Sequence, residues 1–162
     1  MSHEPHDKLQ SAADVPGTSR LVEMTAGEWA GWYHWEPVDD FEEHTGPFYC
    51  KPDGDALVCG FRPEAKNRNG GGNVHGGALM TFADYALFMT ASGMDGSVHG
   101  VTLTMNCEFV GPAETGRLLT ARGEIVRQGF SIVFVRGIID DEGRPVLTFS
   151  GTIKRLTPRE KR

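Results

Sequence analysis

The stretch GALMTFADYALFMTAS, residues 77–92, decides the fold class of this chain. It contains no proline, and its apolar residues fall on nearly every face of a helix, as in a helix that is buried all round. Its single charged residue is Asp84. The stretch therefore predicts a central helix that other elements enclose, and not a helix on the surface.

Four segments with alternating polar and apolar residues follow the predicted helix, and each has the period of a β-strand. Their bounds are 101–110, 118–127, 130–139 and 146–156. Turn sequences with glycine separate them, and because the links are short we expect antiparallel neighbours in a four-strand meander. Helix and strands together predict an α+β fold, in which a curved antiparallel sheet wraps around one central helix.

The segment ahead of the central helix carries shorter signals. Two strand-like runs at 48–51 and 55–62 flank a Pro-Asp-Gly turn and predict a hairpin. Thr25 and Glu28 have capping-box spacing, and aromatic residues then fall on one helical face, which predicts a short helix near 26–35. These aromatic residues are Trp29, Trp32 and Tyr33.

The length of 162 residues predicts one domain with extensions. Residues 1–20 are polar, contain two prolines and predict a disordered tail. We expect residues 21–50 to form an N-terminal helical extension, with a second helical turn at 39–44. The domain itself is predicted to span residues 51–158.

Composition and charge exclude several classes of protein. The chain has 16 basic and 22 acidic residues, a net charge of −6, and interspersed charges, which argues against a nucleic-acid surface. No signal peptide or membrane-spanning run is present. The cysteines and histidines have neither disulfide-framework nor metal-ligand spacing. We therefore expect a cytoplasmic protein that holds no metal and binds neither nucleic acid nor membrane.

Asp84 is the most unusual residue of the predicted helix, because an ionised carboxylate among apolar residues costs several kcal/mol unless something compensates it. It lies too far into the helix to serve as an N-cap. In one interpretation it sits at the helix edge and pairs with an arginine or a backbone amide. In the other it is a general base or nucleophile, with a pKa that burial raises and that nearby amides lower.

The sequence His75-Gly76-Gly77 stands where a glycine-rich loop becomes the helix. Because glycines have no side chains, a ligand oxygen can approach the free amides of the first helical turn. These amides would then form an oxyanion site. The alternative is a plain glycine helix start. Gly70-Gly71-Gly72 is not followed by the lysine of a nucleotide-binding P-loop, so nucleotide binding of that kind is not expected.

The strand at 101–110 has two predicted faces. Odd-numbered positions form the apolar face, namely Val101, Leu103, Met105, Cys107 and Phe109. Cys107 is therefore expected in the core and not as a nucleophile. Thr102 falls on the opposite, polar face with Thr104 and Asn106, where it reads as an ordinary strand residue.

One set of spaced residues resembles the hotdog-fold acyl-CoA thioesterases of the phenylacetate-degradation type. The run NGGGNVHGGALMTFAD at 69–84 carries most of the resemblance, and a threonine eighteen residues beyond Asp84 completes it. The matching residues are Asn69, His75, Gly76, Gly77, Asp84 and Thr102. The resemblance covers about residues 55–156 and implies the hotdog fold.

The resemblance implies a role for each of these residues in hydrolysing an acyl-CoA thioester to a free acid and CoA. Asp84 attacks the thioester or activates water, and Thr102 orients that water. The Asn69 amide and the Gly76 N–H hold the carbonyl oxygen as an oxyanion hole. These roles agree with the chemistry, because thioester hydrolysis needs a stabilised oxyanion and an activated oxygen nucleophile.

The resemblance also implies substrate contacts by His75 and Gly77, and a homodimer or dimer-of-dimers tetramer whose sites lie between subunits. No cofactor is expected, since coenzyme A is part of the substrate. Basic residues are candidates to bind its phosphates. They are Arg62, Lys66, Arg117, Arg122, Arg127, Lys154 and Arg155.

Two other functions remain open at this point. A hydroxyacyl-thioester dehydratase shares the fold but pairs a histidine with an acid as its catalytic groups. The second alternative is a non-catalytic acyl-CoA-binding module. The acyl group is not predicted, because a pocket formed by several segments leaves no linear pattern.

Overall fold

The computed structural model describes residues 20–156, so the predicted tail lies outside the described residues except for Arg20, as do residues 157 and 158. Eight strands of this part form one antiparallel sheet in the order β1-β2-β3-β4-β6-β7-β8-β5. The strands are β1 Arg20–Glu23, β2 Tyr33–Glu36, β3 Phe48–Asp53, β4 Ala56–Phe61, β5 Gly100–Phe109, β6 Leu119–Gln128, β7 Ile132–Asp141 and β8 Arg144–Arg155. The helices are α1 Asp40–Thr45 and α2 Gly76–Ser92, with short 3-10 turns η2 Ala65–Asn67 and η3 Gly93–Asp95. Between residues 20 and 156, no helix has the length and apolar character to cross a membrane.

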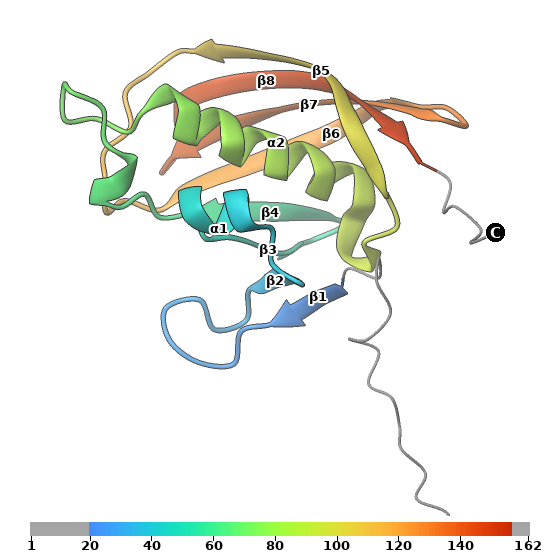
Figure 1. Cartoon of the computed structure of the whole chain (residues 1–162), viewed down its shortest axis with the longest axis horizontal. Helices are drawn as coiled ribbons and strands as arrows, with labels where there is room; N and C mark the ends of the chain where they lie inside the picture. Colours follow the sequence, from blue (N-terminus) through green and yellow to red (C-terminus); the bar gives the residue numbers. More distant parts are fainter. Residues whose placement is uncertain (1–19, 157–162) are drawn as a thin grey trace, which may run out of the picture.

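The central helix α2 lies against the sheet, which curves around it (Figure 1). Phe82, Ala83, Leu87 and Met89 of α2 are fully buried against residues from strands on both halves of the sheet. The helix ends before Gly93, whose φ of 64° is a conformation that other residues rarely adopt. The prediction of an α+β fold with a sheet wrapped around one buried helix is confirmed.

The strand β5 occupies a different place from the predicted one. It pairs with β8 and not with β6, which instead pairs with β4 and β7. The link between β5 and β6, residues 110–118, is long enough to pass two intervening strands, and its buried Ala113 accepts a hydrogen bond from the Val74 N–H at 2.8 Å. The predicted four-strand meander is therefore wrong for its first strand, although β6, β7 and β8 are successive neighbours.

A β-bulge in β5 changes which side chains face the helix. Thr102 pairs with Ile153 and Thr104 with Thr152, so Leu103 is an extra residue without a partner position. The bulge places Thr102 on the same side as Met105, which packs against the core, while Leu103 is 51% exposed. The prediction of one apolar face of odd-numbered residues fails before the bulge. After the bulge, Met105 and Cys107 are partly buried against the core as predicted, whereas Phe109 is 53% exposed.

The predicted helix near 26–35 is wrong. Its last residues belong to β2, which pairs with β1 and β3 and so extends the sheet. Ahead of β2 the chain turns, with φ values of 78° at Gly27 and 81° at Gly31 that interrupt a right-handed helix. The aromatic residues pack on the sheet instead, with Trp29 stacked on Tyr49 at a centroid distance of 4.2 Å.

The predicted helical turn at 39–44 and the following hairpin are confirmed as α1 and as β3 paired with β4. The Asp39 carboxylate caps α1 by accepting the backbone N–H groups of Phe41 at 2.9 Å and Glu42 at 3.0 Å. At the other end the Gly46 N–H donates to the Glu42 carbonyl oxygen at 2.6 Å. Both ends of this short helix are thus fixed, and α1 packs on α2.

Candidate active site

Asp84 and Thr102 form the closest pair of reactive side chains in the site. The Thr102 hydroxyl donates to Asp84 Oδ1 at 2.7 Å and connects the middle of α2 to β5. Both side chains are half-buried. This contact depends on the bulge at Leu103, because without it Thr102 would face away from the helix.

The environment of Asp84 favours its uncharged form more than water does. Burial raises the pKa of the Asp84 carboxyl, and the hydrogen bond from Thr102 offsets only part of that effect. No arginine or lysine forms an ion pair with Asp84 in the part of the chain that the structure describes. The interpretation of Asp84 as a paired structural carboxylate is therefore not supported, and a carboxylate with a raised pKa suits a general base.

A cavity of about 860 Å³ opens beside this pair. Three parts of the chain form it, namely the segment from β2 into α1, the outer side of α2 and the first residues of β5 with the loop before them. Its lining residues are Trp35, Pro37, Val38, Asp39, Glu42, Asp84, Phe88, Ser92, Gly96, Val98, His99, Gly100, Val101 and Thr102. The cavity is large enough for a small organic ligand and mixes apolar walls with a few polar groups.

The start of α2 offers one free amide. His75 caps the helix, and its Nδ1 accepts the Gly77 N–H at 2.9 Å, which places the proton of the neutral ring on Nε2. The Gly77 amide is therefore occupied. The Gly76 N–H has no hydrogen-bond partner among residues 20–156. A Cβ at Gly76 would stand 3.1 Å from the ring of the exposed Phe109, a tight contact that the ring would relieve by shifting a few tenths of an ångström.

The loop before α2 is folded around Asn69. Its Oδ1 accepts the Gly71 N–H at 2.8 Å, its backbone N–H donates to the Asn73 carbonyl at 2.8 Å, and its own carbonyl accepts from Gly72 at 3.1 Å. These bonds fix the side chain with its carboxamide oxygen turned inward to the loop. The amide nitrogen of the exposed Asn69 is left as a donor toward solvent.

The two groups of candidate residues lie apart within one chain. Asp84 follows Gly76 by eight residues on one straight helix, a rise of about 12 Å. A thioester carbonyl needs its oxyanion donors and its nucleophile each within about 3 Å. The structure thus brings Asp84 to Thr102, and collects Asn69, His75 and Gly76 at the start of α2, but it does not bring the two groups together.

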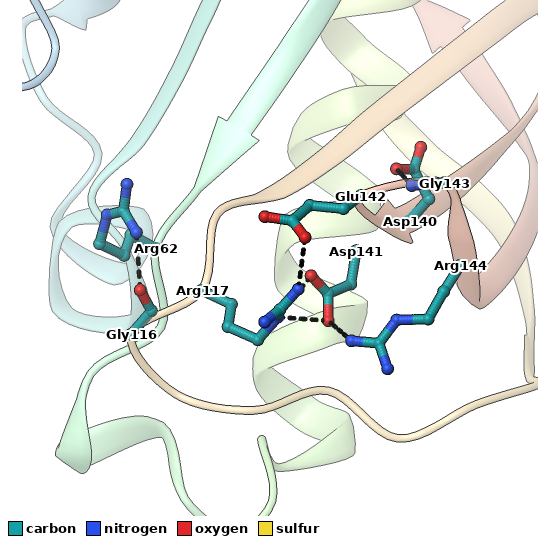
Figure 2. A network of polar contacts seen from close by, with 8 residues as sticks. All are labelled: Arg62, Gly116, Arg117, Asp140, Asp141, Glu142, Gly143 and Arg144. Carbon is teal, nitrogen blue, oxygen red and sulfur yellow. Dashed lines mark hydrogen bonds and ion pairs between the residues drawn. The ribbon is translucent and has the colours of Figure 1, made fainter.

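Several of the predicted phosphate-binding residues hold the fold together instead. Figure 2 shows Arg117 bound to the carboxylates of Asp141 and Glu142, each at 2.7 Å. Arg62 donates to Glu28 and to the Gly116 carbonyl, and Arg122 pairs with Asp53. The candidates that form no ion pair within residues 20–156 are Lys66, Arg127, Lys154 and Arg155.

Sequence reasoning missed the α1 side of the cavity, above all Glu42. Burial, and after it the negative charges of Asp39 and Asp84, together raise the pKa of Glu42 to about 7. A signal for α1 itself exists in the sequence, since Asp39 precedes a short acidic segment. No local pattern places residue 42 beside residue 84, because that contact depends on how α1 packs on α2.

Comparisons with known proteins agree on one family for this chain. The family model described as the thioesterase superfamily matches residues 71–148, a range that includes His75, Gly76, Asp84 and Thr102. A Pseudomonas aeruginosa protein named as an esterase is 32% identical over 108 residues, which are 65% of this chain and 81% of that protein. Mouse acyl-coenzyme A thioesterase 13 is 28% identical over 78 residues, 48% of this chain and 56% of the mouse protein, so the match spans only about half of that relative.

The solved structures agree with the sequence comparison. A mutant of the phenylacetic acid degradation protein PaaI from Thermus thermophilus is 28% identical to this chain, with a TM-score of 0.62. The superposition covers 73% of this chain and all of the Thermus chain, 100%. The shared part is therefore the whole of the Thermus fold, to which this chain adds further segments.

Proposed function

From the chain's membership of the thioesterase superfamily, which makes it a thioester hydrolase, we propose that it splits acyl-CoA thioesters into a free carboxylic acid and CoA. The observation that carries this proposal is the hydrogen bond from Thr102 to Asp84 at the wall of the 860 Å³ cavity. The acyl-coenzyme A thioesterase name of the mouse relative supports CoA as the thiol. The reaction requires water and no cofactor besides the CoA of the substrate.

Asp84 supplies the oxygen chemistry in this proposal. Its ionised carboxylate takes a proton from water as the water attacks the thioester carbonyl, or attacks that carbonyl itself. Thr102 donates to Oδ1, so its own lone pairs accept a hydrogen from the same water and turn it toward Oδ2. The raised pKa of Asp84 makes it a stronger base than an ordinary aspartate.

The Asn69 amide and the Gly76 N–H form the proposed oxyanion hole. One such donor is typically worth about 3 kcal/mol of transition-state stabilisation. Since about 12 Å of helix separate Gly76 from Asp84, we assign the two donors to one subunit and Asp84 with Thr102 to its partner. The proposed active form is accordingly a homodimer, or a tetramer of two such dimers.

Two measurements test the activity. Thiol release from a panel of acyl-CoA thioesters should be catalytic, and product analysis should show the free acid and CoA. A protein that binds these thioesters and releases no thiol from any of them would be an acyl-CoA-binding module. Reversible loss or gain of water with the thioester intact would instead identify a dehydratase.

A complementation experiment tests the division of the site between two chains. Asp84→Ala and Asn69→Ala proteins should each be weak alone. In a mixed dimer one site carries both lesions and the other carries neither, so the heterodimer should recover about half of the wild-type activity. If heterodimers form, as mass measurement shows, and activity stays low, the site does not combine these residues from two chains.

A further inference from the structure

The cavity beside Asp84 has one wall that the family match does not include. Residues 35–42, from the end of β2 into α1, contribute five of its lining side chains, and the family model matches only residues 71–148. Figure 1 shows α1 below α2 in this view, and the two helices pack on each other. The wall is therefore a place where this chain can differ from its relatives in substrate choice.

The charge of the cavity indicates which part of an acyl-CoA it accepts. Its acidic lining residues are Asp39, Glu42 and Asp84, and among the described residues His99 but no lysine or arginine also lines it. CoA carries several phosphate charges, which need basic partners. The remaining walls include Trp35, Val38, Phe88, Val98 and Val101. This cavity consequently suits the acyl group, with the nucleotide of CoA outside it.

Glu42 stands between two cavities. A smaller cavity of about 240 Å³ shares Trp35, Val38, Asp39 and Glu42 with the larger one. Behind Glu42 it reaches the buried side chain of Tyr85, whose hydroxyl lies beside the Cys50 thiol in the core.

The backbone of Glu42 is held in place. The hydrogen bonds at both ends of α1 fix its backbone, and the helix packs on α2. Acidic groups surround it from two sides, namely Asp39 on its own helix and Asp84 on α2. A further negative charge brought into this wall would meet repulsion without a counter-ion.

We infer that Glu42 determines acyl specificity, and that the site accepts acyl groups that are apolar along their length and uncharged at the far end while it rejects acyl groups that end in a carboxylate. This inference rests on the proposed function. A terminal hydroxyl is tolerated, because it donates to the Glu42 carboxylate and can also accept from its protonated form. A terminal carboxylate cannot donate to the Glu42 carboxylate, and to accept from its protonated form it must lose its hydration near the negative charges of Asp39 and Asp84.

Matched substrates test the inference. We would compare hexanoyl-, 6-hydroxyhexanoyl- and adipoyl-CoA, and the corresponding eight-carbon set, which differ only at the far end. Wild-type kcat/KM for the terminal carboxylates should be at least about a hundredfold below that for the methyl compounds. In Glu42→Gln this ratio should shrink by at least about tenfold, because the terminal carboxylates gain more than the methyl compounds.

Glu43→Gln is the control, because Glu43 is on the same short helix and does not line the larger cavity. It should keep the wild-type ratio. A Glu42→Ala variant, which shortens the side chain between the two cavities, should move the preferred chain length upward. An unchanged carboxylate-to-methyl ratio in both Glu42 variants, with normal circular dichroism spectra, would overturn the inference.

A binding measurement separates this inference from the proposed function. Thioether analogues of the same compounds cannot be hydrolysed, and their Kd values report discrimination without turnover. If no thioester is hydrolysed but the thioethers show the Glu42-dependent ratio, hydrolysis fails and the acyl preference stands. If the thioesters are hydrolysed and neither kcat/KM nor Kd depends on Glu42, the preference fails and the hydrolase stands.

Discussion

Asp84 and Asp141 are both shielded from water, but their surroundings shift their carboxyl pKa values in opposite directions. Asp141 is 1% exposed, and Arg117 donates to both of its oxygens at 2.7 Å while Arg144 donates to one of them (Figure 2). Burial alone would raise the pKa of Asp141, but the bonds from the two arginines outweigh it and lower that pKa. Asp84 has one hydroxyl partner, and its pKa is raised.

The difference separates a carboxylate that holds the fold from one that is available for chemistry. The Asp141 network joins the start of β6 to the turn between β7 and β8, and its oxygens are fully engaged. Asp84 keeps one oxygen without a side-chain partner among residues 20–156, at a cavity wall. A half-buried carboxylate without an ion-pair partner costs stability, so its retention next to a cavity supports the role proposed for Asp84.

The largest expected effect is on catalysis by Asp84→Asn. Turnover should fall by at least about a hundredfold, because the amide is neither base nor nucleophile. Substrate binding, measured with thioether analogues, should persist. Near-normal turnover in this variant would show that Asp84 is not the catalytic group. The contrast between a catalytic Asp84 and a structural Asp141 would then be wrong.

Asp141→Asn should show the reverse pattern. Removing the charge leaves Arg117 and Arg144 without their shared buried partner, so the free energy of unfolding should fall by about 2–3 kcal/mol. The activity of the remaining folded protein should be close to wild type. Asp53→Asn is the matched control, since its pair with Arg122 is exposed and should be worth less than about 1 kcal/mol. Equal losses in the two variants, measured by urea unfolding, would contradict a special role for the Asp141 network.

The sequence predicts those parts of the fold that local composition determines. The helix at 77–92 and the strands that follow were recognisable, because period and length are local properties. The pairing of β5 with β8 was not, since it depends on a link that passes two strands. The helix near 26–35 failed because Gly27 and Gly31 take left-handed conformations that aromatic spacing does not reveal.

The candidate site shows the same limit at the level of single residues. Alternation assigned Thr102 to the face away from the core, and the one-residue bulge at Leu103 reverses that assignment. A bulge is a property of two paired strands, so the sequence of one strand alone does not predict it. Only the resemblance connected Thr102 with Asp84. Glu42 lay beyond both kinds of reasoning, because its place depends on the packing of α1 against α2.

Thr102 offers a smaller and more selective test of the Asp84 environment. Thr102→Ser keeps the hydroxyl and should stay within about twofold of wild-type turnover, whereas Thr102→Val should lose about tenfold. The Thr102 bond lowers the pKa of Asp84, so its removal should raise that pKa further. The acidic limb of the pH–rate profile should therefore move to higher pH in the Thr102→Val variant and stay in place in the Thr102→Ser variant. Identical profiles for the two variants would show that Thr102 does not act on Asp84.

The smallest effect is the pH dependence of stability, and it distinguishes the two carboxylates by sign. The raised pKa of Asp84 means that the folded state binds more protons, so its contribution to stability declines as pH rises from the usual carboxyl range through the folded-state pKa. The lowered pKa of Asp141 gives stability above the usual carboxyl range that is lost as pH falls through the folded-state value. Relative to wild type, Asp84→Asn should thus gain stability between acid and neutral pH, while Asp141→Asn should lose stability over the same interval. Urea unfolding of the three proteins at a series of pH values measures both slopes. If both variants change in the same direction, the opposite electrostatic environments assigned to the two carboxylates are wrong.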